Sequence, residues 1–457
     1  MCISSGNALF SHPAYFFPIY AVFTSFFRWY AIFHDARMYV QDIMQKVFEM
    51  NFDFENAVDR RGTASVKWNR NAIASVCGNP DADAFWVADM DFKAEPHIAE
   101  TAERIRNIGV WGYPDFGTLY DSFVEWMKKK HDTVVGKDEI MFANGLLHAL
   151  ALCLQLFSKK GDRVLIPSPT YRPFRMITED NEREIVDWPF PYGNGCYHFD
   201  WESFAEAAEN VDVIMFCSPH NPSGLVFERE DLEFVLRFAK ERNILVFSDE
   251  IHADLVHPGA RHVPMHDANR KIGARCVSFM APSKTFNIAG EHACFALFSD
   301  LEMLKVFRHA QHALRVAEPA YTVGCLTETA YRHGYEYNVE LCRYLKSNAD
   351  FIREYLEEYI PEMKLVNGRA SFVTFIDCSE IYERVKAVVE GNPDKYHAGP
   401  DSGPLSLFFG VDAGVCMNNG KWFGDQYEAF VRFNYGTSRS EIEKALERMK
   451  KAVDSIR

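Results

Sequence analysis

Apolar runs of strand length alternate with amphipathic helical stretches from residue 52 onward. A helical pattern such as residues 230–242 separates neighbouring runs, and strand, helix and strand then repeat. This repetition predicts a mainly parallel sheet with helices on both faces, and it places functional loops at the carboxyl ends of the strands. The runs that we predict to be buried strands are residues 163–167, 213–217, 244–248, 276–280 and 293–299.

The pattern changes near residue 300. Long helical stretches run from residue 301 to about residue 360, and a final helix starts at Ser438. Between them lie strand-like residues 371–377 and 430–434 and a helical stretch at 381–390. This mixture predicts a smaller α+β lobe on the sheet domain, with a ligand cleft between the two. The expected division is an N-terminal arm that joins the small domain (50–95), a large domain (96–330) and a small C-terminal domain (331–457).

The first 49 residues differ from the rest because residues 9–33 are rich in Phe, Tyr and Ala. A membrane anchor or a signal sequence is one interpretation. The stretch is interrupted by His12, Pro13, Pro18 and Arg28. It also lacks the basic segment that precedes the apolar core of a signal sequence. We therefore favour a non-essential extension or an upstream start codon over membrane attachment.

Charge and cysteine usage narrow the class of protein. Lys plus Arg is 49 and Asp plus Glu is 64, so the net charge is −15. This sign argues against nucleic acid or an anionic membrane as the main partner. The 11 cysteines are scattered and form no CxxC pair or Cys/His cluster. They predict buried thiols in a reducing, cytoplasmic compartment, with neither a disulfide framework nor a metal site.

Four polar segments lie within or directly after predicted strands. They are Ser-Pro-His-Asn-Pro-Ser-Gly at 218–224, Ser-Asp-Glu-Ile-His at 248–252, Ala-Pro-Ser-Lys-Thr-Phe at 281–286 and Phe-Val-Arg-Phe-Asn at 430–434. Alone, each segment is ordinary: a turn, a helix cap, a solvated lysine, a surface arginine. Together, in this order and with separations of 249 − 221 = 28 and 284 − 249 = 35 residues, they indicate one functional site.

The set resembles the fold-type I pyridoxal 5′-phosphate (PLP) enzymes of the aspartate aminotransferase superfamily. More closely, residues 50–457 resemble the MalY/PatB group of C–S lyases. The resemblance implies an α/β, three-layer PLP-dependent transferase fold, with a mainly parallel sheet and a smaller α+β C-terminal domain. The segments that carry it are residues 52–54, 59–63, 65–68, 85–92, 112–113, 248–252, 281–287 and 422–424.

The chemistry of PLP then suggests roles for individual residues. Its aldehyde needs an amine, for which Lys284 is the candidate. Its pyridine nitrogen stays protonated beside a buried carboxylate, and Asp249 is the candidate. The resemblance assigns Asn221 to the 3-oxygen of the ring and to the substrate. Tyr171 matches the aromatic cover of the ring, although plain core packing would explain it as well.

The phosphate of PLP needs backbone N–H groups at the start of a helix. Gly145, Leu146 and Leu147 precede and begin an apolar helical run, and Ser283 could add a hydroxyl. The resemblance implies that Tyr113 reaches the phosphate of a neighbouring subunit, which predicts a homodimer. A tyrosine in an ordinary turn is the alternative for this residue.

The substrate is expected to be an amino acid. Arg432 matches the arginine that binds the substrate α-carboxylate, because a planar guanidinium suits a bidentate contact. Ala88 lies in a segment, residues 86–89, that we expect near this carboxylate. His252, three residues after Asp249, is a weaker cofactor-site candidate, because a lone buried histidine is more often a core residue.

Two positions favour a lyase over an aminotransferase. Many aminotransferases of the superfamily have Arg eight residues after the lysine and Tyr three residues after the aspartate. Here these positions are His292 and His252. We therefore predict α,β-elimination of cystathionine or cysteine S-conjugates to pyruvate, ammonia and a thiol. An aminotransferase and a PLP-binding regulator are the alternatives. After Ala289-Gly290, the C–S lyases have an apolar residue followed by Gln, whereas this chain has Glu291-His292. The specificity for the leaving group therefore stays open.

Overall fold

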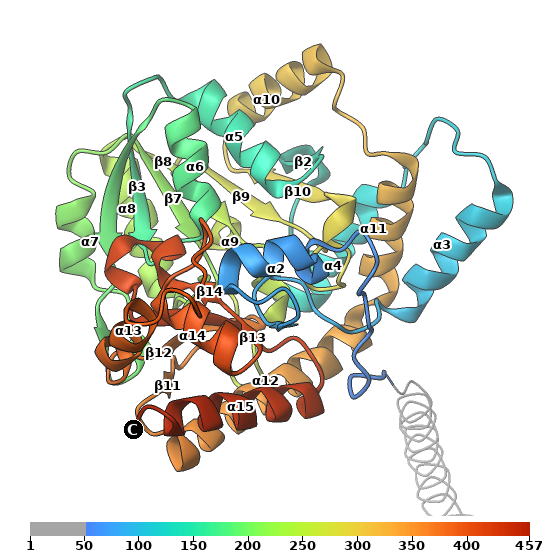
Figure 1. The fold of residues 1–457 in the computed structure, drawn as a ribbon. Helices are drawn as coiled ribbons and strands as arrows, with labels where there is room; N and C mark the ends of the chain where they lie inside the picture. The colour runs from blue at the N-terminus through green and yellow to red at the C-terminus, as the bar shows by residue number, and fades with distance from the viewer. Residues whose placement is uncertain (1–51) are drawn as a thin grey trace, which may run out of the picture. The chain divides into compact units, whose positions relative to one another are not determined.

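The computed structural model describes residues 52–457, and a seven-stranded sheet lies at its centre (Figure 1). The strand order is β2-β10-β9-β8-β7-β3-β4. The strands are β2 (Ile140–Ala143), β3 (Arg163–Ser168), β4 (Glu184–Pro189), β7 (Val213–Cys217), β8 (Leu245–Asp249), β9 (Cys276–Met280) and β10 (Cys294–Phe298). The five strands from β9 to β4 run parallel, which confirms the predicted α/β class. Strand β10 runs antiparallel to both β9 and β2.

Helices cover both faces of this sheet because its strands are apolar on both sides. In β8, Leu245 and Phe247 belong to the core on one face and Val246 to the core on the other. The first face packs against α5 (Leu146–Phe157), α6 (Arg172–Asp180) and α10 (Leu301–Leu314). The second packs against α7 (Trp201–Ala207), α8 (Arg229–Glu241) and α9 (Met265–Asn269).

A second, antiparallel sheet has the order β11-β12-β15-β14. Its strands are β11 (Lys364–Leu365), β12 (Val373–Asp377), β14 (Asn418–Asn419) and β15 (Phe430–Asn434). The accompanying helices are α12 (Tyr335–Tyr359), α13 (Tyr382–Glu390), α14 (Pro404–Asp412) and α15 (Arg439–Asp454). The α+β character predicted after residue 300 is therefore present.

The N-terminal segment of the described chain joins this C-terminal part. Strand β1 (Asp83–Ala84) pairs in parallel with β13 (Val415–Cys416), and α2 (Arg70–Cys77) packs against α14. Residues 53–457 form one compact unit, so the domain boundaries at 95 and 330 stay a prediction. The predicted extension, residues 1–49, lies outside the described residues.

The remaining elements complete the unit. Helix α11 (Tyr321–His333) contacts both α3 (Pro96–Ile108) and α4 (Leu119–His131), and β5 (Tyr192–Gly193) pairs with β6 (Cys196–Tyr197). Single 3-10 turns are Val66–Trp68, Lys137–Glu139, Ala253–Leu255, Ala289–Glu291, Gly420–Phe423 and Asp425–Tyr427. Within residues 52–457, no helix combines the length and apolar character that a membrane span needs.

Candidate active site

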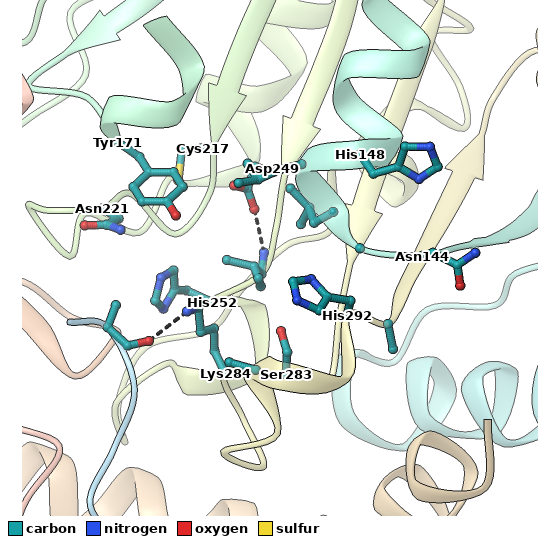
Figure 2. Close-up of a pocket in the computed structure, with 17 residues that line it drawn as sticks. Asn144, His148, Tyr171, Cys217, Asn221, Asp249, His252, Ser283, Lys284 and His292 are labelled. Atoms are coloured by element: carbon teal, nitrogen blue, oxygen red, sulfur yellow. Dashed lines mark hydrogen bonds between the residues drawn. The ribbon is translucent and has the colours of Figure 1, made fainter. Parts of the chain in front are cut away.

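A cavity of about 270 Å³ lies at the carboxyl edge of the parallel strands (Figure 2). Every predicted site residue except Tyr113 and Arg432 lines it. These lining residues are Ala88, Gly145, Leu146, Leu147, Tyr171, Asn221, Asp249, His252, Ser283 and Lys284. Figure 2 shows Tyr171 and Asn221 at the left of the view, Ser283 and His292 near its centre beside Lys284, and His148 and Asn144 at its right.

The sheet brings the residues together although they are distant in sequence. Asp249 ends β8 and pairs across to Cys217 of β7 and Phe279 of β9, so the three strands finish at one level. Residues alternate faces along a strand, and Asp249 therefore faces the same side as Leu245 and Phe247, where α5 lies. The segment after β9 then carries Lys284 to the same place.

Asp249 is a buried carboxyl with a single neutral donor. Its Oδ1 accepts a hydrogen bond from the Ile251 backbone N–H at 3.0 Å, and the side chain is 3% exposed. Burial, aided by the charge of Glu250, raises the pKa of this carboxyl to about 7 against the opposing charge of Lys284. A cation placed in the cavity beside it, such as a protonated pyridine nitrogen, would stabilise the ionised form.

The Lys284 amine donates a hydrogen bond to the Ala88 carbonyl oxygen at 2.7 Å. Burial lowers the pKa of this amine from 10.5 to about 8, and Arg432 adds to the effect while Asp89 and Asp249 oppose it. A substantial fraction of the amine is therefore neutral near physiological pH, as a nucleophile or a proton acceptor requires.

Helix α5 begins at the cavity with the geometry of an anion site. Gly145 is its N-cap, with φ 105° and ψ 146°, and the N–H groups that follow have no partner within the helix. The positive φ favours glycine here, and an added Cβ atom would lie in close contact with the His292 side chain, 3.4 Å from its Nδ1. The Asn144 amide instead donates to the Val316 carbonyl oxygen at 3.1 Å, and Figure 2 shows it turned from the cavity.

Arg432 is a buried guanidinium without an acidic partner among the described residues. Its Nη2 donates to the Trp86 carbonyl oxygen at 2.6 Å and to Asn418 Oδ1 at 2.9 Å, and its Nη1 lies 3.5 Å from Asn221 Oδ1. Its Nε is buried and has no hydrogen-bond partner in the described structure. Burial lowers the pKa of Arg432 to about 10, so the group stays charged and fits an incoming carboxylate.

Comparisons with known proteins identify the family of the chain. The sequence profile of the aminotransferase class I and II family matches residues 81–449. The chain belongs to this family. It is 32% identical over 409 residues to cystathionine beta-lyase PatB of Bacillus subtilis (strain 168), covering 88% of this chain and 100% of PatB.

Two solved structures show the same fold. Cystalysin from Treponema denticola, which contains a PLP cofactor, superposes with a TM-score of 0.79 and 27% identity over 89% of this chain and 100% of cystalysin. The PLP-bound C–S lyase from Staphylococcus hominis gives a TM-score of 0.77 and 26% identity over 88% of this chain and 98% of that chain. The predicted fold-type I architecture is thereby confirmed.

The cavity has the features that PLP would need in a member of this family. An amine, a buried carboxyl, an aromatic ring and a helix N-terminus occupy separate parts of its wall. They match the aldehyde, the pyridine nitrogen, the ring face and the phosphate, respectively. The residue roles themselves remain predictions.

For two predicted site residues, Tyr113 and His252, the structure gives weaker support. Tyr113 is fully exposed and lies outside the cavity of its own chain, in a segment where Val110 and Trp111 are also exposed. His252 lines the cavity, but its Nδ1 lies 3.1 Å from Ser371 Oγ, and burial lowers the pKa of its ring to about 3. A neutral histidine that positions its neighbours fits these facts better than an acid or base.

The sequence interpretation missed the side chains that hold the segment around Ala88. Asn287 contacts the backbone of Met90 and Phe92, and Asn434 donates to the carbonyl oxygens of Val87 and Asp89. The signal was available, because both asparagines end segments already singled out. Asn287 also has φ 56°, a left-handed conformation that asparagine tolerates better than most residues.

Proposed function

We propose that this protein is a PLP-dependent C–S β-lyase that converts cystathionine or cysteine S-conjugates to pyruvate, ammonia and a thiol. The observation that carries the proposal is the convergence of Lys284, Asp249 and the α5 N-terminus on one cavity. The guanidinium of Arg432, which has no acidic partner among the described residues, lies beside this cavity and contacts Asn221. The identity to PatB, which is named a cystathionine beta-lyase, supports the choice of reaction.

When bound, PLP supplies an aldehyde for covalent attachment and a ring that accepts electrons from the substrate α-carbon. Asp249 keeps the ring nitrogen protonated, and Tyr171 covers the ring face. Gly145 and the first N–H groups of α5 would bind the phosphate, and Ser283, which lines the same cavity, would add a hydroxyl donor. In this way the chain holds three separate parts of the cofactor in one orientation.

The chain's own groups then act on the amino acid. Arg432 binds the α-carboxylate and so orients the α-carbon towards Lys284. The neutral amine of Lys284 accepts the α-proton, and its lowered pKa suits that exchange. The C–S bond breaks, and the thiolate leaves with the bonding electron pair and takes up a proton. Hydrolysis of the remaining three-carbon fragment gives pyruvate and ammonia.

A direct assay separates a lyase from an aminotransferase. Purified protein loaded with PLP is given cystathionine or cysteine without any keto acid. Pyruvate, ammonia and a thiol from cystathionine, or pyruvate, ammonia and hydrogen sulfide from cysteine, should appear in equal amounts. Turnover that depends on an added keto acid, with no thiol released, would overturn the lyase in favour of transamination.

We also propose that two copies form a homodimer in the cytoplasm. The exposed apolar side chains of Ile108, Val110, Trp111 and Tyr113 favour burial against another surface. A second copy would place Tyr113 at the neighbouring cavity. All ten cysteines in the described part of the chain are free, which favours a reducing compartment.

A further inference from the structure

Residues 86–91 form an irregular segment, here called the strap, that borders the candidate active site at Ala88, and functional side chains donate to its carbonyl groups. Arg432 donates to the Trp86 carbonyl oxygen at 2.6 Å, and Lys284 to that of Ala88 at 2.7 Å. Asn434 donates to the carbonyl oxygen between them, on Val87, at 2.6 Å. The strap therefore contacts both the guanidinium and the amine.

One lysine holds this strap at both ends. The Trp86 indole N–H donates to the Lys67 backbone carbonyl at 3.0 Å. The Lys67 amine donates to the Asp89 carbonyl oxygen at 3.1 Å and to Asp91 Oδ2 at 2.9 Å. The acceptor of Arg432 is on Trp86, the first attachment residue, and the acceptor of Lys284 is on Ala88, between the two attachment points.

The anchor is a buried cluster of balanced charge. Lys67 is 1% exposed and Asp91 is 4% exposed. Arg60 pairs with both Asp91 Oδ1, at 2.8 Å, and the Asp89 carboxylate, at 3.0 Å. Buried ion pairs are weak contributors to net stability, but they impose one arrangement because any other leaves a charge unpaired. A positional role explains why charge is buried here.

We propose that Lys67 and Asp91 are positioning residues. By holding the strap in place, they set the position of the Arg432 guanidinium relative to the Lys284 amine. The inference rests on the proposed function, in which Arg432 binds the substrate carboxylate and Lys284 moves the proton. Neither Lys67 nor Asp91 lines the cavity. Their effect reaches the substrate through the Trp86 and Ala88 carbonyl groups.

The test uses the full-length enzyme loaded with PLP, with Lys67→Met, Lys67→Arg and Asp91→Asn. Arg183→Met is the matched control. Arg183 is also buried, but its guanidinium bonds to Ser158 and the Leu154 carbonyl at the far end of α5. Three quantities are measured: the kinetic constants, the dissociation constant of an unreactive amino-acid analogue, and the pH midpoint of the cofactor's visible absorbance.

Lys67→Met and Asp91→Asn should raise KM and the analogue's dissociation constant about tenfold and lower kcat by a similar factor, because small misplacements of reacting groups are costly. The pH midpoint should shift because the backbone beside Lys284 would no longer be held in place. Lys67→Arg should recover part of each change. Arg183→Met should lower the melting temperature and leave all three quantities unchanged.

Folded Lys67→Met and Asp91→Asn with wild-type constants would overturn the inference. If neither variant folds, Arg60→Met decides, since Arg60 is 22% exposed on its side chain. It should show smaller changes in the same direction, and wild-type values would again overturn the inference. A wild-type protein that binds no PLP would instead overturn the proposed function.

Discussion

Lys284 and Asp249 line one cavity from the ends of neighbouring strands, and the charge of each acts on the other. Burial dominates for both groups. It brings the pKa of the amine down to about 8 and that of the carboxyl up to about 7. Without cofactor, both groups therefore change charge near neutral pH, and this relationship leads to the first two predictions.

Capture of PLP by the apoenzyme should accelerate as pH rises towards about 8 and level off above it. The reason is that only the neutral Lys284 amine attacks an aldehyde. Capture is measured by stopped-flow absorbance, with Lys284→Ala as the control that forms no covalent adduct. A rate that keeps rising to the ordinary lysine value of 10.5 would contradict the environment described for this amine.

Asp249→Asn should stabilise the apoenzyme at pH 8 while weakening the binding of PLP. The folded-state pKa of Asp249 is raised, so its contribution to stability is present below about 4 and is lost as pH rises through about 7. At 1.36 kcal/mol per pKa unit, the variant gains up to about 4 kcal/mol at pH 8. Urea unfolding of both apoproteins measures the difference, which should vanish at acid pH. If the variant were less stable than wild type at pH 8, the predicted direction of the change in unfolding free energy would be wrong.

Arg432→Lys should raise KM for amino-acid substrates by one to two orders of magnitude, roughly, because an ammonium cannot replace a planar bidentate donor. The loss should be specific to the α-carboxylate. Binding of a decarboxylated analogue, an S-substituted cysteamine, should change little between wild type and variant. Equal losses for both ligands would assign Arg432 a purely structural role.

Gly145→Ala should weaken PLP binding about tenfold through a strained backbone at φ 105°. Binding of pyridoxal, which lacks the phosphate, should be nearly unchanged if Gly145 serves the phosphate. Gly195→Ala is the matched control, since Gly195 also has a positive φ of 74° but has no atom within 4 Å of an added Cβ. Fluorescence titration of the wild-type and the two variant apoproteins with both ligands gives the six affinities.

Co-expression of Tyr113→Ala and Lys284→Ala chains should restore activity that neither variant has alone. In a mixed dimer, one cavity would combine an intact Lys284 with the intact Tyr113 of the other chain. Differently tagged chains allow the mixed dimer to be purified and assayed. No recovery in a verified mixed dimer would place Tyr113 outside the neighbouring site.

Most strands of the two sheets were predictable from the sequence because they are continuously apolar, whereas β4, which exposes Glu184, Asp187 and Pro189, was not predicted. The predicted runs 213–217, 276–280 and 430–434 coincide with β7, β9 and β15. Strand β2 was missed, since its four residues merge into the apolar helix that follows. The direction of β10 was also beyond the sequence, because an apolar run carries no information on parallel or antiparallel pairing.

The site was predictable where a motif carries its own chemistry, as at Lys284 and Asp249. The contacts of Arg432 were not, because Trp86 and Asn418 reach it through tertiary packing. Lys67 shows most clearly what the sequence alone could not predict. A lysine in a polar stretch indicates a solvated side chain, and its burial depends on Asp91, 24 residues further along the chain.

The reversed direction of β10 makes residues 285–293 a link with both ends fixed at the rim of the cavity. It leaves from Lys284 and must arrive at Cys294, where β10 enters the sheet between β9 and β2. An insertion or deletion in this link would displace either the Lys284 amine or strand β10. Diversification of substrate preference along this link should therefore proceed by exchange of side chains, as at Glu291 and His292, with its length unchanged.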